Sequence, residues 1–405
     1  MSWTDGPINP MNSLLDPRND EALAVCDAVE RYVRLELAPH CLRSETPIPT
    51  AVCRAVVTGL VDIGVLNLGE ATGWGLWDDA RAPLNRRVSI RTLQCLARQS
   101  PSIGYQAHLQ ALAAYLDRLA GVPEPRGTAV VSLQGHLGLG RDALAAALGD
   151  AALTPEQQAI LGDNWAWPSR DRPRWLHALP DWTATWIATW DGDAGWMWRR
   201  AERATLGVEV HAHSLGLDEL TTHAVTAPAD GPRIAATATI DGPAARDALP
   251  ALLAVHGAAL LALSQSVAEV AWGKAREYAR ARYQGGQAII AHVAVQRLLS
   301  DALGAAHEAS QALERLGQAG ADWPDLPALW RDRARCQVRL SAAASAALQV
   351  FGGLGYMRDN GMEKLLRHTA HLRLLGGSPE ELSLCVAHWD AVRGESPSDV
   401  RDRSP

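Results

Sequence analysis

Three long alanine-rich segments in the second half of the chain constrain the fold most strongly. Apolar residues recur at helical spacing over Leu249–Arg282, His292–Leu316 and Pro327–Leu348, and glycine turns separate the segments. Alanine faces let helices approach closely, and successive long helices with short connections pack as antiparallel neighbours. The pattern predicts a helical bundle over residues 246–393 and a disordered polar tail over residues 394–405.

Residues 1–125 are predicted to form a separate helical domain. Helical spacing of apolar residues extends over Asn19–His40, Thr50–Ile63, Val88–Arg98 and Ser102–Leu119, and a glycine-rich turn covers Gly69–Trp77.

A β-rich domain is predicted between the two helical parts, over residues 126–245. Strand patterns occur at Ala129–Leu133, Asp181–Trp190, Leu206–Val210 and Leu220–Val225, and the second of them carries Trp182, Trp186 and Trp190 on one face. Two helical segments, at residues 142–148 and 154–161, interrupt this domain. The chain therefore reads as all-α, then β, then all-α.

Composition excludes several classes of function. A net charge of −7 and the lack of a basic run argue against a nucleic-acid partner. The apolar run Ala251–Trp272 is interrupted by polar residues, so no membrane span is expected, and the first residues show no secretion signal. The six scattered cysteines lack C-x-x-C pairs, which indicates buried thiols in a reducing cytoplasm rather than disulfides or zinc ligands.

The stretch Gln349–Glu381 carries the clearest motif. Glycine turns at Phe351–Gly355 and Gly376–Pro379 bracket an amphipathic segment. Such turns let backbone approach a ligand, and the alternative is a pair of helix C-caps in a bundle. The stretch resembles the C-terminal signature of acyl-CoA dehydrogenases, in which Q-x-F-G-G-x-G-Y is followed by E-K-L-x-R-D and then by R-I-x-E-G-T-x-E, with Ser378 in place of the Thr. The matching residues are Gln349, Phe351, Gly352, Gly353, Gly355, Tyr356, Glu363, Lys364, Leu365, Arg367, Arg373, Gly377, Ser378 and Glu380.

This resemblance implies a fold and a cofactor. The expected fold is mainly α with a central β domain: an N-terminal helical domain, a middle β-barrel or sandwich and a C-terminal four-helix bundle. The expected cofactor is FAD, shared between subunits of a homo-oligomer or hetero-oligomer such as a tetramer. The residues implied to bind it are Arg282, Gln284, Gln349, Gly352, Gly353, Ser378 and Glu380. For Arg282, the alternative is a solvated arginine favoured by the helix dipole.

The middle domain departs from the family pattern. The flavin-cradling T-E-x-x-x-G-S-D segment has no clean counterpart near Val130–Arg141, although Gly135, Gly138 and Gly140 indicate a loop there. Near the family's W-I-T-N strand, Pro168 has no backbone N–H to offer a flavin ring.

The family's catalytic carboxylate is also missing. The resemblance puts this glutamate at one of two positions, which are Gly376 and His256 in this chain. His256 is the candidate base, because its ordinary pKa lies near neutrality, and the alternative is a core histidine. Two further pairs, His211 with His213 and His368 with His371, have spacings that suit a metal or ordinary packing, and no metal site is expected.

Three functions remain open. The first is a flavin enzyme that oxidises an acyl-CoA thioester and passes electrons to an acceptor flavoprotein. The second is a non-catalytic subunit of a mixed α₂β₂ assembly that completes a partner's flavin site. The third is a flavin-dependent oxygenase acting on a small molecule, which does not need the glutamate.

Overall fold

The structure is a computed structural model. It describes residues 20–41, 45–123, 127–133, 141–148, 152–211, 214–227, 236–318 and 326–394. The predicted tail, apart from Gly394, and the glycines at 135, 138 and 140 lie outside the described residues, as does His213.

The N-terminal part is helical, as predicted. Its elements are α1 (Asp20–Tyr32), the π-helical turn η2 (Val33–Leu37), the 3₁₀ turn η3 (Ala38–Cys41), α2 (Thr50–Asp62), α3 (Pro83–Gln99) and α4 (Pro101–Leu119). Proline occupies the first turn of α3 and of α4, where its missing N–H leaves no intrahelical bond unmade. The Ser100 hydroxyl caps α4 by accepting a hydrogen bond from the backbone N–H of Ile103.

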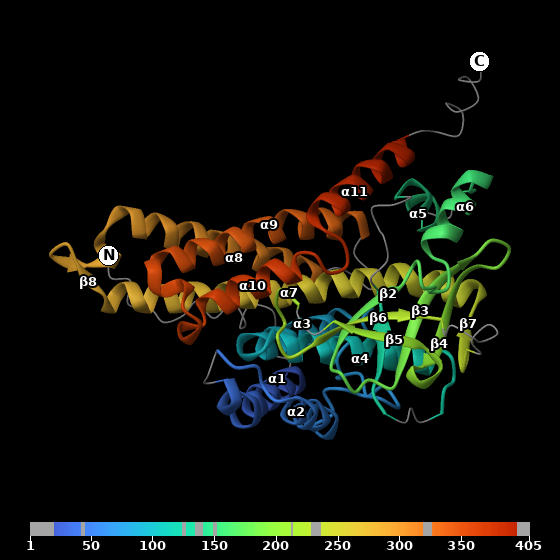
Figure 1. The fold of residues 1–405 in the computed structure, drawn as a ribbon, viewed down its shortest axis with the longest axis horizontal. Helices are drawn as coiled ribbons and strands as arrows, with labels where there is room; N and C mark the ends of the chain where they lie inside the picture. Colours follow the sequence, from blue (N-terminus) through green and yellow to red (C-terminus); the bar gives the residue numbers. More distant parts are fainter. Residues whose placement is uncertain are drawn as a thin grey trace, which may run out of the picture.

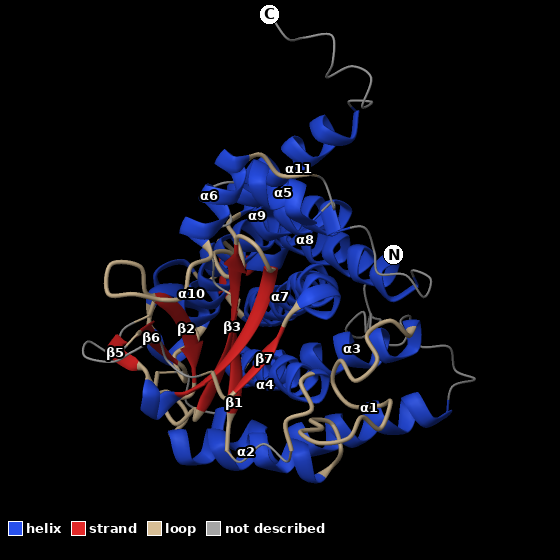
Figure 2. Ribbon diagram, turned by 90° about the vertical axis from the view of Figure 1, so that its right-hand side faces the viewer, coloured by secondary structure: helices blue, strands red, loops and turns tan. Residues whose placement is uncertain are grey.

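The middle part contains two sheets. One has the strand order β1 (Ala129–Ser132), β3 (Ala184–Asp191), β4 (Gly195–Glu202), β7 (Ala238–Ile240), and β1 pairs with β3 in parallel. The other is antiparallel, in the order β2 (Arg174–Ala178), β6 (Thr221–Thr226), β5 (Gly207–His211). The interrupting helices are α5 (Arg141–Leu148) and α6 (Pro155–Asn164). The larger sheet lies beside α7 and α4, and its strand β1 contacts β2 of the smaller sheet (Figure 2).

Buried tryptophan side chains make up much of the core around the larger sheet. Trp182 and Trp186 of the predicted strand are 1 % and 0 % exposed, and Trp198 of β4 is also fully buried. The sequence pattern missed β2 and β4 because polar side chains such as Arg174, His177 and Arg200 are buried in them, and it missed β7 because that strand has only three residues.

The C-terminal part is a bundle. Its elements are α7 (Gly242–Ala281), the hairpin β8 (Tyr283–Gln284) and β9 (Gln287–Ala288), η5 (Ile289–Ala291), α8 (Val293–Gln318), α9 (Leu326–Val350), the turns η6 (Gly352–Tyr356) and η7 (Arg358–Asn360), α10 (Met362–Leu372) and α11 (Pro379–Gly394). Helices α7, α8 and α9 pack against one another, and α10 packs on α7 and α9 (Figure 1). The predicted fold class is confirmed: the chain is mainly helical, with a central β domain and a C-terminal helical bundle.

Helix α7 bears on the expectation that no segment spans a membrane. It is the one helix in the described part of the chain that is long and apolar enough to cross a bilayer, with a mean hydropathy of 1.6 in its most apolar window. However, 94 % of that window is buried inside the protein. Its apolar surface is therefore explained by packing in the centre of the fold.

The cysteines follow the expectation. All six are free thiols, and five of them are buried.

Candidate functional site

A pocket of about 740 Å³ lies at the end of the bundle that carries the β8–β9 hairpin. The C-terminus of α7, the N-terminus of α8 and the C-terminus of α9 meet there with the η6 turn. Five of the seven residues predicted to contact a cofactor line this C-terminal pocket, namely Arg282, Gln284, Gln349, Gly352 and Gly353.

The chemistry of the C-terminal pocket suits a nucleotide. Tyr278 and Phe351 stack at 4.2 Å between ring centroids and form an aromatic wall. Arg282 is exposed at the pocket, where its guanidinium can offer a planar set of donors to phosphate oxygens. Gly352 has a φ of +59°, and a Cβ atom on Gly352 or Gly353 would meet no atom within 4 Å. The backbone at these glycines is therefore open to close approach by a ligand.

Ser378 and Glu380 lie elsewhere. They stand at the start of α11, which follows the C-terminal end of α10, whereas the η6 turn of the C-terminal pocket precedes the N-terminal end of α10. The Ser378 backbone N–H donates to the Glu381 carboxylate at 2.8 Å, and the Ser378 hydroxyl accepts from the Glu381 N–H at 3.2 Å. Glu380 pairs with Arg373 at 2.8 Å. In this structure both residues cap and brace a helix end.

The two candidate base positions lie against each other. A Cβ atom built on Gly376 would be 2.7 Å from Cδ2 and 2.9 Å from Nε2 of His256. Gly376 also has a φ of +59°, which favours glycine. The two residues are 120 positions apart in the sequence, but they are in contact in the fold. We call the place where they meet the base position. The imidazole ring occupies the space into which a side chain at position 376 would extend.

His256 belongs to a buried chain of hydrogen bonds that the sequence did not reveal. Nε1 of Trp77 donates to Nδ1 of His108 at 3.0 Å, and Nε2 of His108 lies 3.0 Å from Nδ1 of His256. The two imidazole rings stack with their centroids 5.2 Å apart. Trp77, His108 and His256 are 3 %, 0 % and 2 % exposed. They come from the N-terminal part and from α7, so no local motif joins them.

Burial keeps both histidines neutral. It lowers the pKa of His108 to about 3. Burial, followed by the neighbouring His108 and the charge of Arg333, lowers the pKa of His256 well below its ordinary value. Desolvation disfavours the charged imidazolium, so at pH 7 each ring carries a single proton.

Arg333 holds the loop that contains Gly376. Its guanidinium donates to the carbonyl oxygens of Leu375, Gly376 and Gly377, at 2.7 Å for Gly376 and 3.2 Å for Gly377. The side chain is 1 % exposed, and the nearby charge of Glu381 only partly offsets the effect of burial on its pKa. Burial lowers the pKa of Arg333 to about 10, which still leaves it positively charged at pH 7. The base position therefore lies beside a buried cation.

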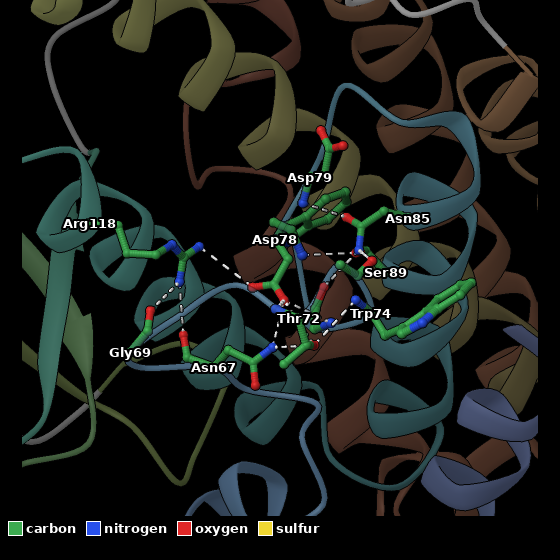
Figure 3. Close-up of polar contacts among 12 residues, drawn as sticks. Asn67, Gly69, Thr72, Trp74, Asp78, Asp79, Asn85, Ser89 and Arg118 are labelled. Carbon is green, nitrogen blue, oxygen red and sulfur yellow. Dashed lines mark hydrogen bonds and ion pairs between the residues drawn. The ribbon is translucent and has the colours of Figure 1, made fainter. Parts of the chain in front are cut away.

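The glycine-rich turn that carries Trp77 is held by a polar network (Figure 3). The Asp78 carboxylate accepts hydrogen bonds from the backbone N–H groups of Thr72 and Gly75 at 2.9 and 3.1 Å and pairs with Arg118 at 3.5 Å. Trp77 itself has a φ of +62°, a conformation that a bulky residue adopts at a cost of about 1–3 kcal/mol. The backbone N–H of Trp77 donates to the Ser89 hydroxyl at 2.9 Å.

The E-K-L-x-R part of the motif joins the β domain to the bundle. Lys364 pairs with Glu219 at 2.9 Å, and Arg367 pairs with Asp218 through both carboxylate oxygens. His368 Nδ1 accepts from the Leu217 N–H at 2.9 Å. We call this set the α10 clamp.

The histidine pairs give no metal site in the described residues. His371 Nδ1 accepts from the Gly216 N–H at 3.1 Å, so His368 and His371 both serve backbone donors on the same loop. No group of three or more His, Cys, Asp or Glu side chains that could hold a metal occurs among the residues that the structure describes.

The region expected to receive a flavin ring is partly described. Trp165 is 3 % exposed, and its carbonyl oxygen accepts from the Trp190 N–H at 2.9 Å. The Pro168 carbonyl accepts from the Ala227 N–H at 3.1 Å. These backbone groups bond within the protein.

Comparisons with known proteins give one family and many related folds. Residues 246–389 match the family described as "Acyl-CoA dehydrogenase, C-terminal domain". A search of curated protein sequences gives no match.

Three solved structures illustrate the likeness. Glutaryl-CoA dehydrogenase from Mycobacterium smegmatis, in complex with FADH2, has a TM-score of 0.70 and 14 % identity, with 95 % of this chain and 96 % of that chain covered. Butyryl-CoA dehydrogenase from Megasphaera elsdenii has a TM-score of 0.65 and 13 % identity, with 92 % and 98 % covered. A chain of the ChsE4–ChsE5 complex from Mycobacterium tuberculosis has a TM-score of 0.63 and 16 % identity, with 95 % and 99 % covered. At these identities the likeness establishes the fold.

Proposed function

Because residues 246–389 match the C-terminal domain of acyl-CoA dehydrogenases and the whole chain shares their fold, we propose that it is a dehydrogenase-like flavoprotein of this family. The C-terminal pocket is the observation that carries the proposal. It gathers Arg282, Gln284, Gln349, Gly352 and Gly353 around about 740 Å³. A basic fork, an aromatic wall and open glycine backbone suit the adenosine diphosphate part of FAD.

Each pocket residue has a part in this proposal. Arg282 would bind the pyrophosphate, while Gly352 and Gly353 would let the main chain approach it. Gln349 has an amide that donates to the Tyr356 hydroxyl at 2.8 Å, and Gln284 lies on the hairpin beside it. Bound FAD would supply a hydride acceptor. Ser378 and Glu380 remain predicted contacts near the cofactor.

The length of α7 favours a cofactor shared between subunits. Arg282 follows His256 by 26 residues, which corresponds to ~39 Å along a helix. That span exceeds the length of an FAD molecule, so the C-terminal pocket and the base position of one chain serve different cofactor molecules. This separation supports an oligomer in which a second copy or a homologous subunit would supply the rest of each site.

The substrate proposed first is an acyl-CoA thioester, with an electron-acceptor flavoprotein as the redox partner. A specific observation favours a second candidate function. Neither candidate base position holds a carboxylate, and the His256 ring packs where a side chain at position 376 would extend. This supports a non-catalytic subunit that completes the flavin site of a homologous partner. The six free cysteines suit the cytoplasm as the location of either.

The visible spectrum of the purified chain tests the proposal. Bound flavin that bleaches with an acyl-CoA supports the dehydrogenase. Flavin that binds only after a homologous subunit is added supports the partner subunit, and flavin reduced by NADH and a reductase but not by thioesters supports an oxygenase.

Two arginine variants make this test specific to the pocket. Arg282→Ala should weaken FAD binding about tenfold or more, because it removes charge-assisted hydrogen bonds to phosphate. Arg331→Ala, which removes an exposed arginine paired with Asp390, is the control and should leave binding unchanged. Failure to bind flavin under every one of these conditions, or equal effects of the two variants, contradicts the proposal.

A further inference from the structure

We infer that Trp77 and His108 fix His256 as a hydrogen-bond donor, so that the base position receives an acceptor oxygen of a ligand instead of removing a proton. The inference rests on the proposed function only for the identity of the base position. The orientation of the imidazole follows from hydrogen bonds within this chain.

Trp77 sets the direction of the chain of bonds. An indole Nε1 carries a hydrogen and can only donate, so Nδ1 of His108, 3.0 Å away, must accept. Since a neutral imidazole has one donor nitrogen and one acceptor nitrogen, Nε2 of His108 then carries the hydrogen. It donates to Nδ1 of His256 at 3.0 Å. The hydrogen of His256 is thereby left on its Nε2.

The opposite arrangement fails. If Nδ1 of His256 donated to His108, the hydrogen of His108 would lie on Nδ1 and face the indole hydrogen of Trp77. Two donors would then meet at 3.0 Å with no acceptor between them. Both rings are neutral because burial lowers their pKa values, so the arrangement with two donors on one ring does not arise at pH 7.

The Nε2–H of His256 is a donor without an acceptor. His256 is 2 % exposed, and its Nε2 has no hydrogen-bond partner within the described part of the chain. A buried N–H in this state is destabilising until an acceptor reaches it. The nitrogen faces Gly376, whose loop is bound by the buried cation Arg333. A donor beside a positive charge favours an oxygen with full or partial negative charge, such as a carboxylate or a thioester carbonyl.

The surrounding structure holds Trp77 in this arrangement although its backbone is strained. Trp77 stands at a φ of +62°, and the Asp78 network next to it holds the turn in place (Figure 3). A strained residue persists where neighbouring contacts over-determine it. Here the strained residue is the one that supplies the indole donor. Trp77 and His108 are thus positioning residues that act through His256.

Long-range ¹H–¹⁵N correlation spectra of the full chain, labelled with ¹⁵N in the histidine rings, test the assignment. His256→Gln identifies the His256 resonances by their loss. At pH 7 we expect Nε2 of His256 to give a protonated-type signal and Nδ1 an unprotonated-type signal. An unprotonated Nε2 would overturn the inference and restore His256 as a possible base. The measurement needs no bound flavin, so it is independent of the test of the proposed function.

Trp77→Phe tests the origin of the tautomer. Without the indole donor, His108 and His256 can exchange both arrangements, and we expect a second set of His256 signals. Trp175→Phe, which removes an indole not bonded to His108, should leave the spectrum of His256 as it is. An unchanged spectrum in Trp77→Phe would contradict the role of Trp77. If that variant does not fold, the unaltered chain alone still decides the state of Nε2.

Two thioesters test the ligand class. Butyryl-CoA offers a thioester carbonyl, and glutaryl-CoA offers a terminal carboxylate in addition. We expect at least one of them to shift the Nε2–H resonance of His256 downfield, as a new hydrogen bond does. A shift with both identifies the carbonyl, and a shift with glutaryl-CoA alone identifies the carboxylate. No shift with either contradicts the assignment of an acceptor-binding site.

Discussion

At position 376, two constraints act on a single residue. The backbone is left-handed, with a φ of +59°, and the ring of His256 fills the space beside the Cα atom. Each constraint alone disfavours a side chain. The glycine is therefore explained by its neighbours as well as by the turn it makes.

Gly376→Ala should lower the free energy of unfolding by about 3 kcal/mol, from left-handed strain and from overpacking against His256. Gly353→Ala is the control, since its Cβ would meet nothing within 4 Å, and should change stability by less than about 0.5 kcal/mol. Urea unfolding measures both. In the double variant His256→Ala/Gly376→Ala the steric part disappears, so the effects should not add. Equal effects of the two glycine substitutions would contradict this account.

The buried histidines predict a loss of stability in mild acid. Burial lowers the folded-state pKa of His108 to about 3, whereas an unfolded histidine titrates near 6.5. The unfolded chain binds the extra proton as pH falls below about 6.5, so the stability that neutral His108 contributes is complete above that pH and is lost toward pH 3. Between pH 7 and pH 5, this one group should account for about 2 kcal/mol.

Replacing His108 isolates its contribution to the loss of stability between pH 7 and pH 5. Urea unfolding of His108→Gln at pH 7 and pH 5 should show a pH effect smaller by about 2 kcal/mol than in the unaltered chain. His307→Gln, at an exposed position of α8, should keep the full effect. If the pH effect in His108→Gln matches that in His307→Gln, His108 is not buried in its neutral form.

At the scale of elements, the α10 clamp attaches the β domain to the bundle through charges with little access to water. Burial alone would raise the pKa of Glu219, but Lys364 and the other donors around the carboxylate outweigh it, and the pKa lies below its ordinary value. The carboxylate also accepts from the Ser102 hydroxyl of α4. One side chain thus connects three parts of the fold.

Lys364→Met should lower the free energy of unfolding by about 3 kcal/mol, because it leaves the Glu219 carboxylate buried without its cation. The double variant Glu219→Gln/Lys364→Met removes both charges and should recover part of that loss. Arg373→Met breaks a pair with an exposed partner, Glu380, and should change stability much less, because water screens that pair. Thermal or urea unfolding compares the three variants. Equal losses from Lys364→Met and Arg373→Met would rule out a special role for the clamp.

At the scale of the whole molecule, periodicity was enough to predict most of the helices. Amphipathic or alanine-rich repeats longer than about three turns gave α2, α4, α7, α8 and α9 within a few residues, except at the start of α7. The strands β2 and β4 were missed because their inward polar residues depend on distant partners. Arg200 of β4, for example, is 5 % exposed and pairs with Asp117 of α4 at 3.0 Å. The sequence around Arg200 does not indicate that its partner is Asp117.

One of the two candidate sites could be predicted from the sequence, and the other could not. The C-terminal pocket could be predicted because a continuous motif supplies Gln349, Gly352 and Gly353, and the end of a single helix supplies Arg282. The surroundings of His256 could not be predicted, because Trp77, His108 and Arg333 come from three distant segments. Trp77 ends the predicted glycine-rich turn, but no local pattern joins it to His108 or Arg333, and only the fold brings the three together.

The contact between His256 and Gly376 sets the order in which substitutions could introduce a carboxylate here. Glutamate at position 376 would collide with the imidazole ring, so that change has to follow the loss of His256. Glutamate at position 256 meets no such barrier, since it removes the ring itself and places its carboxylate near the buried charge of Arg333. A single substitution can therefore introduce a carboxylate at position 256 of α7, whereas a carboxylate at position 376 of the loop requires a second substitution.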